Sequence, residues 1–185
     1  MNKIIKGSIS DIAKKKNQSP AQSLLSCSLL VLLDVSYSMN SRDAREGMSR
    51  HELAEEELIH LQGTNEGKIA LVCFSSSVQV CFDGRPIIAN GGTNLAKGLE
   101  QIKMVDGTGI KILVISDGQP DNEQRALEVA GTFSSPINTL HIGPETDIRG
   151  KAFLDRLSAK SGGKSMKSKE IGSLESGVKL MLTAG

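Results

Sequence analysis

Short apolar runs alternate with longer amphipathic stretches along this chain of 185 residues. The short runs are apolar at successive positions, which is typical of parallel strands that are covered on both faces. The longer stretches carry apolar residues at helical spacing. The predicted strands are Ser28–Val35, Lys68–Phe74, Ile110–Ser116 and Ile137–Ile142, and the predicted helices are Arg50–Gln62, Leu95–Met104, Asn122–Phe133, Arg149–Ser161 and Glu170–Leu182.

This alternation predicts an α/β fold of three layers, with a doubly wound, mostly parallel sheet and helices on both of its faces. The segment FSSSVQVCF, residues 74–82, indicates a hairpin turn that leads into one short antiparallel edge strand. Ser49 and Glu52 have the spacing of a capping box, which places the start of the first long helix near Arg50.

The first 22 residues have a different pattern, dominated by lysine and serine. Three isoleucines share one helical face there, but Gly7, Ser8 and Ser10 disfavour an isolated helix. We therefore expect residues 1–22 to form a flexible N-terminal tail and residues 23–185 to form one domain with its own core.

Composition excludes several classes of function. The net charge of +1 and the 3% of aromatic residues give little basis for binding nucleic acid. Cys27, Cys73 and Cys81 are odd in number and lack metal-ligand spacing, so we expect reduced thiols.

The apolar stretch after Cys27 is interrupted by Asp34 and has neither the order of an export signal nor the length of a membrane span. We expect a cytoplasmic protein that does not bind membranes.

Candidate chemistry lies at the ends of two predicted strands. Asp34 ends the first strand and Asp117 ends the run KILVIS, and the carboxyl ends of parallel strands meet at one rim of a sheet. No lysine or arginine stands beside either acid in the sequence. Because two carboxylates at one rim repel each other unless a positive charge lies between them, the pattern predicts a divalent cation.

The neighbouring side chains indicate which cation this is. Ser36, Ser38 and Thr93 add hydroxyl oxygens, and no histidine or cysteine falls in these stretches, so the expected cofactor is Mg²⁺ or Mn²⁺. The hydroxyls are expected to coordinate the ion directly, while Asp34 and Asp117 orient water molecules. Neutral ligands leave the ion with much of its charge, which favours an anionic oxygen from outside as the last ligand.

These residues carry a family resemblance. DVSYS, residues 34–38, resembles the D-x-S-x-S signature of von Willebrand factor type A (vWA) domains, and the match runs from about Leu29 to the C-terminal helix. Thr93 in GGTNL and Asp117 in ISDG resemble the other two parts of the family's metal-ion-dependent adhesion site, the MIDAS. The resemblance implies a Rossmann-like sheet whose metal binds an acidic residue of a partner protein. It also implies work inside larger assemblies, often with AAA-type ATPases.

One position departs from the family pattern. Tyr37 stands where the family often has glycine, which leaves the metal ligands intact but changes the rim of the site. We assign the partner-binding rim to Tyr37, Met39 and Asn94.

The same residues are compatible with other interpretations. The serines and acids are also suited to capping turns and helices, and His141, inside a strand pattern, is expected to be a core residue rather than a ligand. An alternative function is a Mg²⁺-dependent phosphoryl-transfer or hydrolytic enzyme with Asp34 as nucleophile, but such enzymes generally need an acid where Ser36 stands. A purely structural scaffold would need no metal. We expect a non-enzymatic module for protein–protein interaction.

Overall fold

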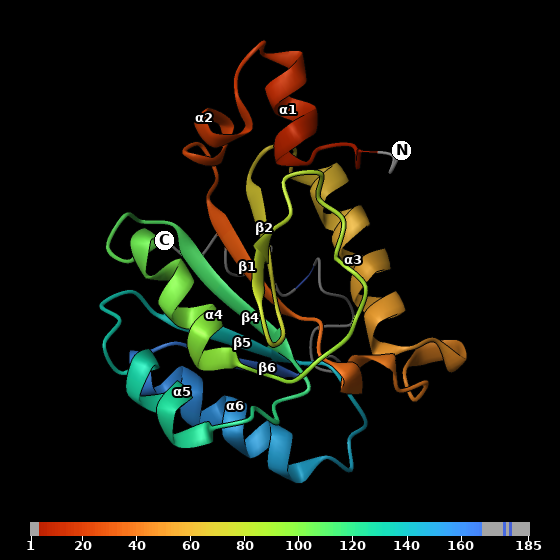
Figure 1. The fold of residues 1–185 in the computed structure, drawn as a ribbon, viewed down its shortest axis with the longest axis vertical. Helices are drawn as coiled ribbons and strands as arrows, with labels where there is room; N and C mark the ends of the chain where they lie inside the picture. The colour runs from red at the N-terminus through yellow and green to blue at the C-terminus, as the bar shows by residue number, and fades with distance from the viewer. Residues whose placement is uncertain (1–3, 168–175, 177, 179–185) are drawn as a thin grey trace.

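A central sheet with helices packed against it forms the body of the protein in a computed structural model that describes residues 4–167, 176 and 178 (Figure 1). The strands are β1 (Leu29–Asp34), β2 (Ile69–Phe74), β3 (Val78–Val80), β4 (Lys111–Ser116), β5 (Ile137–His141) and β6 (Ser165–Lys167). The helices are α1 (Ile9–Lys15), α2 (Pro20–Leu24), α3 (Arg50–Thr64), α4 (Leu95–Ile102), α5 (Glu123–Ala130) and α6 (Ile148–Ser161). Short 3₁₀ turns lie at η1 (Tyr37–Asn40), η2 (Arg45–Gly47) and η3 (Lys103–Val105).

The strands of the described part form one sheet in the order β3-β2-β1-β4-β5-β6. β1 pairs in parallel with β2 on one side and with β4 on the other, whereas β3 pairs antiparallel with β2 at the edge. This confirms the predicted Rossmann-like α/β fold with one antiparallel edge strand. The chain leaves β1 in one direction and later returns to build β4 on its other side. The switch point between β1 and β4 is where ligands bind in such sheets.

Both faces of the sheet are buried because successive side chains of a strand point to opposite sides. Leu30 and Leu32 of β1 pack into one core with residues of α4, α5 and α6, including Phe153. Leu29 and Leu33 pack into a second core with α3, including Leu58. The continuous apolar run of β1 is therefore explained by helices on both faces, as predicted.

The predicted elements agree with the structure except near their ends. The four predicted strands and the first four predicted helices are confirmed, each to within a few residues. The three residues of β6, Ser-Met-Lys, were missed because they carry no apolar run. The predicted helix Glu170–Leu182 lies outside the described residues apart from positions 176 and 178. No described helix has both the length and the apolar composition needed to cross a membrane.

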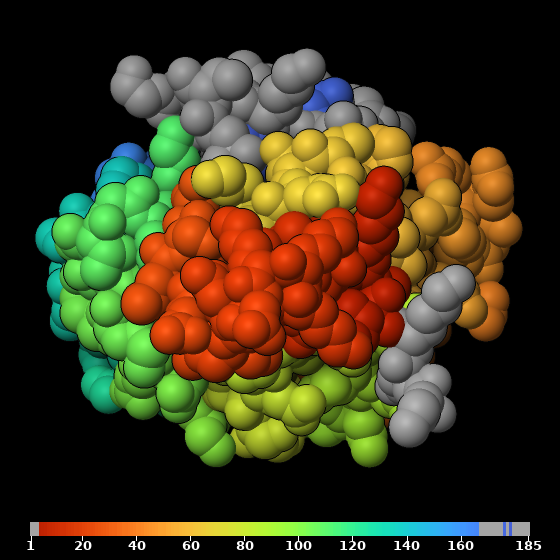
Figure 2. Space-filling view, turned by 90° about the horizontal axis from the view of Figure 1, so that it is seen from above, coloured from red at the N-terminus to blue at the C-terminus, as the bar shows by residue number. Residues whose placement is uncertain are grey.

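The structure contradicts the prediction of a flexible N-terminal tail. Residues 9–15 form α1, and Ile9 and Ile12 are buried. The backbone N–H of Ile5 donates to Asp83 O at 3.0 Å, and that of Gly67 donates to Gly7 O at 2.8 Å. Seen from above in Figure 2, the N-terminal segment covers the upper end of the molecule. A domain boundary at residue 23 is therefore wrong.

Tertiary packing explains why the local prediction failed. Gly7 has a φ of +81°, and a Cβ at this position would lie 2.0 Å from the carbonyl oxygen of Gln62. The glycine that weakens an isolated helix is thus the residue that lets the segment approach α3 closely. Burial of the isoleucines then stabilises a helix that would be marginal alone.

Candidate metal centre

The two candidate acids lie at the carboxyl end of neighbouring central strands. Asp34 is the last residue of β1, and Asp117 follows directly after β4; both side chains are buried. Ser116 Oγ donates a hydrogen bond to Asp34 Oδ2 at 2.6 Å and accepts one from the backbone N–H of Gly118 at 2.9 Å. Ser116, which the sequence analysis missed, therefore joins the ends of the two strands.

Burial makes Asp34 a weak acid. Desolvation raises its pKa to about 6, and the charge of Asp117 acts in the same direction. Hydrogen bonds from Ser116 and Ser36 lower the pKa again but only in part. The expected repulsion between the two acids is thus present in this structure, and a cation that relieved it would favour the ionised form of Asp34.

Ser36 and Ser38 bring their hydroxyls together beside Asp34. The backbone N–H of Ser36 donates to Asp34 Oδ1 at 2.8 Å, and the two hydroxyl oxygens of the serines lie 3.1 Å apart. The 3₁₀ turn η1 begins after Ser36, so alternate side chains diverge here: Ser36 is buried and Ser38 half-buried, whereas Tyr37 is 73% exposed. The local turn therefore gathers three of the five candidate ligands.

The loop that carries Thr93 reaches the same edge of the sheet through backbone bonds. The N–H of Asn90 donates to Val35 O at 2.8 Å, and the N–H of Tyr37 donates to Gly91 O at 3.0 Å. Asp121 Oδ1 accepts from the N–H of Thr93 at 2.9 Å. These bonds place the loop of Thr93, which is itself buried, next to the segment that holds the serines.

A buried arginine contacts the second acid, and sequence reasoning did not predict it. Arg50, the first residue of α3, donates from Nη1 to Asp117 Oδ2 at 2.9 Å. Its Nε and Nη2 donate to the two carboxylate oxygens of Asp43 at 2.8 and 2.6 Å. The bidentate contact lowers the pKa of Asp43. A basic residue is unusual in the first turn of a helix, and that was the available signal.

The donor set suits a hard divalent cation. Asp117 Oδ1 is buried and has no hydrogen-bond partner among the described residues, although Oδ2 of the same carboxylate is bonded to Arg50. Together with the serine hydroxyls and Asp34 it offers oxygen alone, as Mg²⁺ and Mn²⁺ require. No group of three or more histidine, cysteine, aspartate or glutamate side chains in the described part is placed to hold a metal. Hydroxyl ligands are therefore essential to the candidate site.

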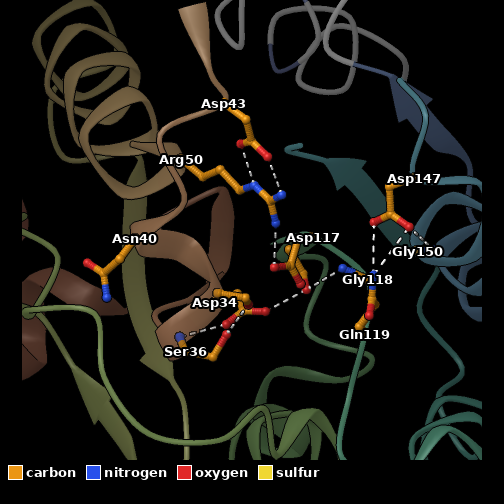
Figure 3. Close-up of polar contacts among 12 residues, drawn as sticks. Asp34, Ser36, Asn40, Asp43, Arg50, Asp117, Gly118, Gln119, Asp147 and Gly150 are labelled. Atoms are coloured by element: carbon orange, nitrogen blue, oxygen red, sulfur yellow. Dashed lines mark hydrogen bonds and ion pairs between the residues drawn. The ribbon is translucent and has the colours of Figure 1, made fainter. Parts of the chain in front are cut away.

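His141 is a core residue next to this site, as predicted. It is 2% exposed, and its Nε2 lies 3.5 Å from Asp147 Oδ2. Burial lowers the pKa of His141, although the contact with Asp147 acts in the opposite direction. Asp147 accepts from the backbone N–H of Gly150 at 3.0 Å, which caps the start of α6 (Figure 3).

The three residues assigned to the rim divide into two groups. Tyr37 and Asn94 are exposed, and Asn94 also caps α4 by accepting from the N–H of Lys97 at 3.1 Å. Met39 is 0% exposed, so its assignment to the rim is wrong. The turn η1 directs Met39 into the core between the sheet and α3, where it packs with Val35. Asn40, which is exposed, bonds to Tyr37 O and Ala89 O instead.

Comparison with known proteins does not identify a family for this chain. No protein-family model and no curated protein sequence matches this chain. Among solved structures, it is similar to proximal thread matrix protein 1 from the mussel byssus, with 16% sequence identity and a TM-score of 0.49. The match covers 83% of this chain and 45% of that one, so this chain spans less than half the length of the mussel protein. The function has to be inferred from the site itself.

Proposed function

We propose that this protein binds a partner protein through Mg²⁺, or Mn²⁺, held by Asp34, Ser36, Ser38, Thr93 and Asp117. The observation that carries the proposal is the buried, unpartnered Oδ1 of Asp117 beside a second buried acid and two adjoining hydroxyls. A buried carboxylate oxygen without a partner is costly, and a cation would remove that cost. The resemblance of DVSYS, GGTNL and ISDG to the MIDAS of vWA domains supports the same assignment.

Each residue has a distinct role in this proposal. The hydroxyls of Ser36, Ser38 and Thr93 are neutral ligands, whereas Asp34 and Asp117 are suited to accept hydrogen bonds from water bound to the ion. When bound, the cation supplies positive charge at the edge of the sheet. Because its protein ligands neutralise little of that charge, the best external ligand is a carboxylate, the side chain of an Asp or Glu on the partner.

The exposed residues near the serines support a protein partner. The phenol ring of Tyr37 is 73% exposed and Ile88 is 88% exposed. Asn40 Nδ2 donates to both Tyr37 O and Ala89 O, so these two segments lie side by side. Aromatic and aliphatic side chains around a polar centre are typical of protein–protein contacts. An AAA-type ATPase assembly in the cytoplasm remains the partner suggested by the vWA resemblance.

The alternative function, an enzyme with Asp34 as nucleophile, has less support. Asp34 is fully buried, and its two oxygens accept from the N–H of Ser36 and the hydroxyl of Ser116. A nucleophile needs access to its substrate and a base nearby, and His141 is engaged with Asp147. The arrangement is better suited to orienting ligands than to attacking a substrate.

Metal binding can be tested at Thr93, whose hydroxyl can be removed or kept. We expect wild-type protein and Thr93→Ser to bind Mg²⁺ or Mn²⁺ in isothermal titration, and Thr93→Val, which keeps the shape but not the oxygen, to bind at least about tenfold more weakly. Circular dichroism should be the same for all three proteins. Equal affinity in Thr93→Val and wild type would exclude Thr93 as a ligand.

Partner binding needs a separate test. The tagged protein should capture its partner from the source cell in Mg²⁺, and the complex should dissociate in chelator. The Thr93→Val variant should capture it weakly and Thr93→Ser normally. A complex that survives chelator undiminished would contradict adhesion through the metal, whatever the result of the titration.

A further inference from the structure

Arg50 is a buried cation that already lies at the candidate metal site. It is 9% exposed, and all three of its guanidinium nitrogens donate to carboxylates. Two of these bonds go to Asp43, whose side chain is 36% exposed, and one goes to Asp117, whose side chain is 2% exposed. Figure 3 shows the guanidinium between the two acids, with Asp34 on the far side of Asp117.

We propose that Arg50 is a positioning residue and an internal counter-ion: its charge competes with the divalent cation for Asp117, and Asp43 weakens that competition. This inference rests on the proposed function, because it concerns how tightly the same site holds Mg²⁺ or Mn²⁺. It predicts that the affinity of the site for metal is set by a pair of residues that do not contact the metal.

The geometry divides the carboxylate of Asp117 between two cations. Oδ2 is bonded to Arg50, and Oδ1 has no partner among the described residues. The guanidinium therefore holds the carboxylate so that one oxygen is left for water bound to the metal. The same positive charge reduces the attraction of Asp117 for a second cation, and screening by water is weak at a buried site.

Asp43 acts against the charge of Arg50. Its two oxygens accept from Nε and Nη2 of Arg50, so the pair is close to neutral when seen from the metal site. Removing the charge of Asp43 would expose the full charge of Arg50. Removing the charge of Arg50 would leave the negative charge of Asp117 uncompensated, and Asp117 would then attract the metal ion more strongly.

A purely structural role predicts a different result. Arg50 also joins α3 to the preceding loop, because its N–H donates to Ser41 O at 3.1 Å. If the ion pair served only to hold this loop, the loss of either partner would loosen the site and weaken metal binding. The electrostatic role predicts effects of opposite sign at the two partners, which a loosened site would not give.

The test measures the dissociation constant for Mn²⁺ from the electron paramagnetic resonance signal of the free ion, using the full chain. We expect Arg50→Met to bind Mn²⁺ at least about tenfold more tightly than wild type and Asp43→Asn to bind it several-fold more weakly. Arg50→Lys keeps the charge and should remain close to wild type. Arg42→Met is the matched control, because Arg42 forms an exposed ion pair with Glu52 at 3.0 Å.

The outcomes separate this inference from the proposed function. Wild-type protein that does not bind Mn²⁺ at all would overturn the metal site, and the role of Arg50 with it. Normal wild-type binding with both variants weakened, or with both unchanged, would overturn only the counter-ion role. Should Arg50→Met fail to fold by circular dichroism, Arg50→Gln, which also removes the charge but keeps a polar side chain, replaces it, and binding of Mn²⁺ by Arg50→Gln that is no tighter than that of wild type refutes the proposal.

Discussion

The raised pKa of Asp34 predicts that this residue destabilises the metal-free protein at neutral pH. Burial raises the pKa from 3.8 to about 6, so the folded protein holds the proton more tightly than the unfolded chain does. Stability that Asp34 contributes at acid pH is therefore lost as the pH rises from about 4 through about 6. The direction is the reverse of that for a carboxylate stabilised by an ion pair.

The magnitude follows from the difference between the two pKa values. A difference of one pKa unit corresponds to about 1.4 kcal/mol, so ionisation of Asp34 lowers the free energy of unfolding by about 3 kcal/mol in total. About 2 kcal/mol of this decrease falls between about pH 4.5 and about pH 7.5. Other acids of the protein titrate in the opposite sense, including Asp43, whose pKa is lowered by Arg50. Their contributions cancel when wild type is compared with Asp34→Asn, which cannot ionise at this position.

The assay is urea unfolding of wild type and Asp34→Asn, in chelator, at these two pH values. We expect the free energy of unfolding of the variant, relative to that of wild type, to rise by about 2 kcal/mol from the acid to the neutral condition. Adding Mg²⁺ at neutral pH should stabilise wild type and not the variant. A difference between the two proteins that stays constant within about 0.5 kcal/mol across the pH range would refute the reasoning.

Three further predictions concern the segment at the N-terminus, the turn after β4 and the rim. Ile9, which is 1% exposed, is packed in the core, so Ile9→Ala should cost about 2–4 kcal/mol in urea unfolding; no loss would restore the flexible tail. Gly118 has a φ of +79°, and a Cβ there would lie 2.3 Å from Gly150 O. Gly118→Ala should therefore cost at least about 2 kcal/mol more than Gly47→Ala, where φ is +74° and no atom lies within 4 Å; equal costs would exclude the close approach as the cause. Tyr37→Gly should leave Mg²⁺ affinity within a few-fold but weaken partner binding at least about tenfold, whereas unchanged partner binding would remove Tyr37 from the interface.

Patterns that depend on neighbours in the sequence predicted most of the fold. The apolar run that ends at Asp34 and the one that ends before Asp117 identified two strand ends, and parallel pairing was enough to expect the two acids at one edge. Tyr37, which lies between Ser36 and Ser38, was likewise assigned to the rim, and it is 73% exposed. Each of these features is set by the geometry of a strand or a single turn.

Features that depend on distant contacts could not be predicted in this way. Which way the Met39 side chain points is decided by the face of η1 that packs against the core. The helix α1 is stabilised by burial against residues that follow it in the chain by more than fifty positions. Lys15 of α1, for example, forms one ion pair with Asp11 in its own helix and another with the distant Glu66 at 3.2 Å. The helix propensity of a segment contains no information about these distant partners. The free energy gained by burying the segment in the folded protein outweighs its weak helix propensity.

The candidate site shows the same division. The sequence alone placed candidate oxygen side chains at the ends of two central strands, because one apolar run stops at Asp34 and the other stops directly before Asp117. Only the tertiary structure decided that a positive charge is already present there, since Arg50 precedes Asp117 by 67 positions and reaches it through the packing of α3 on the sheet. Electrostatic interactions act through space, whereas sequence patterns report mainly the order and local geometry of the chain.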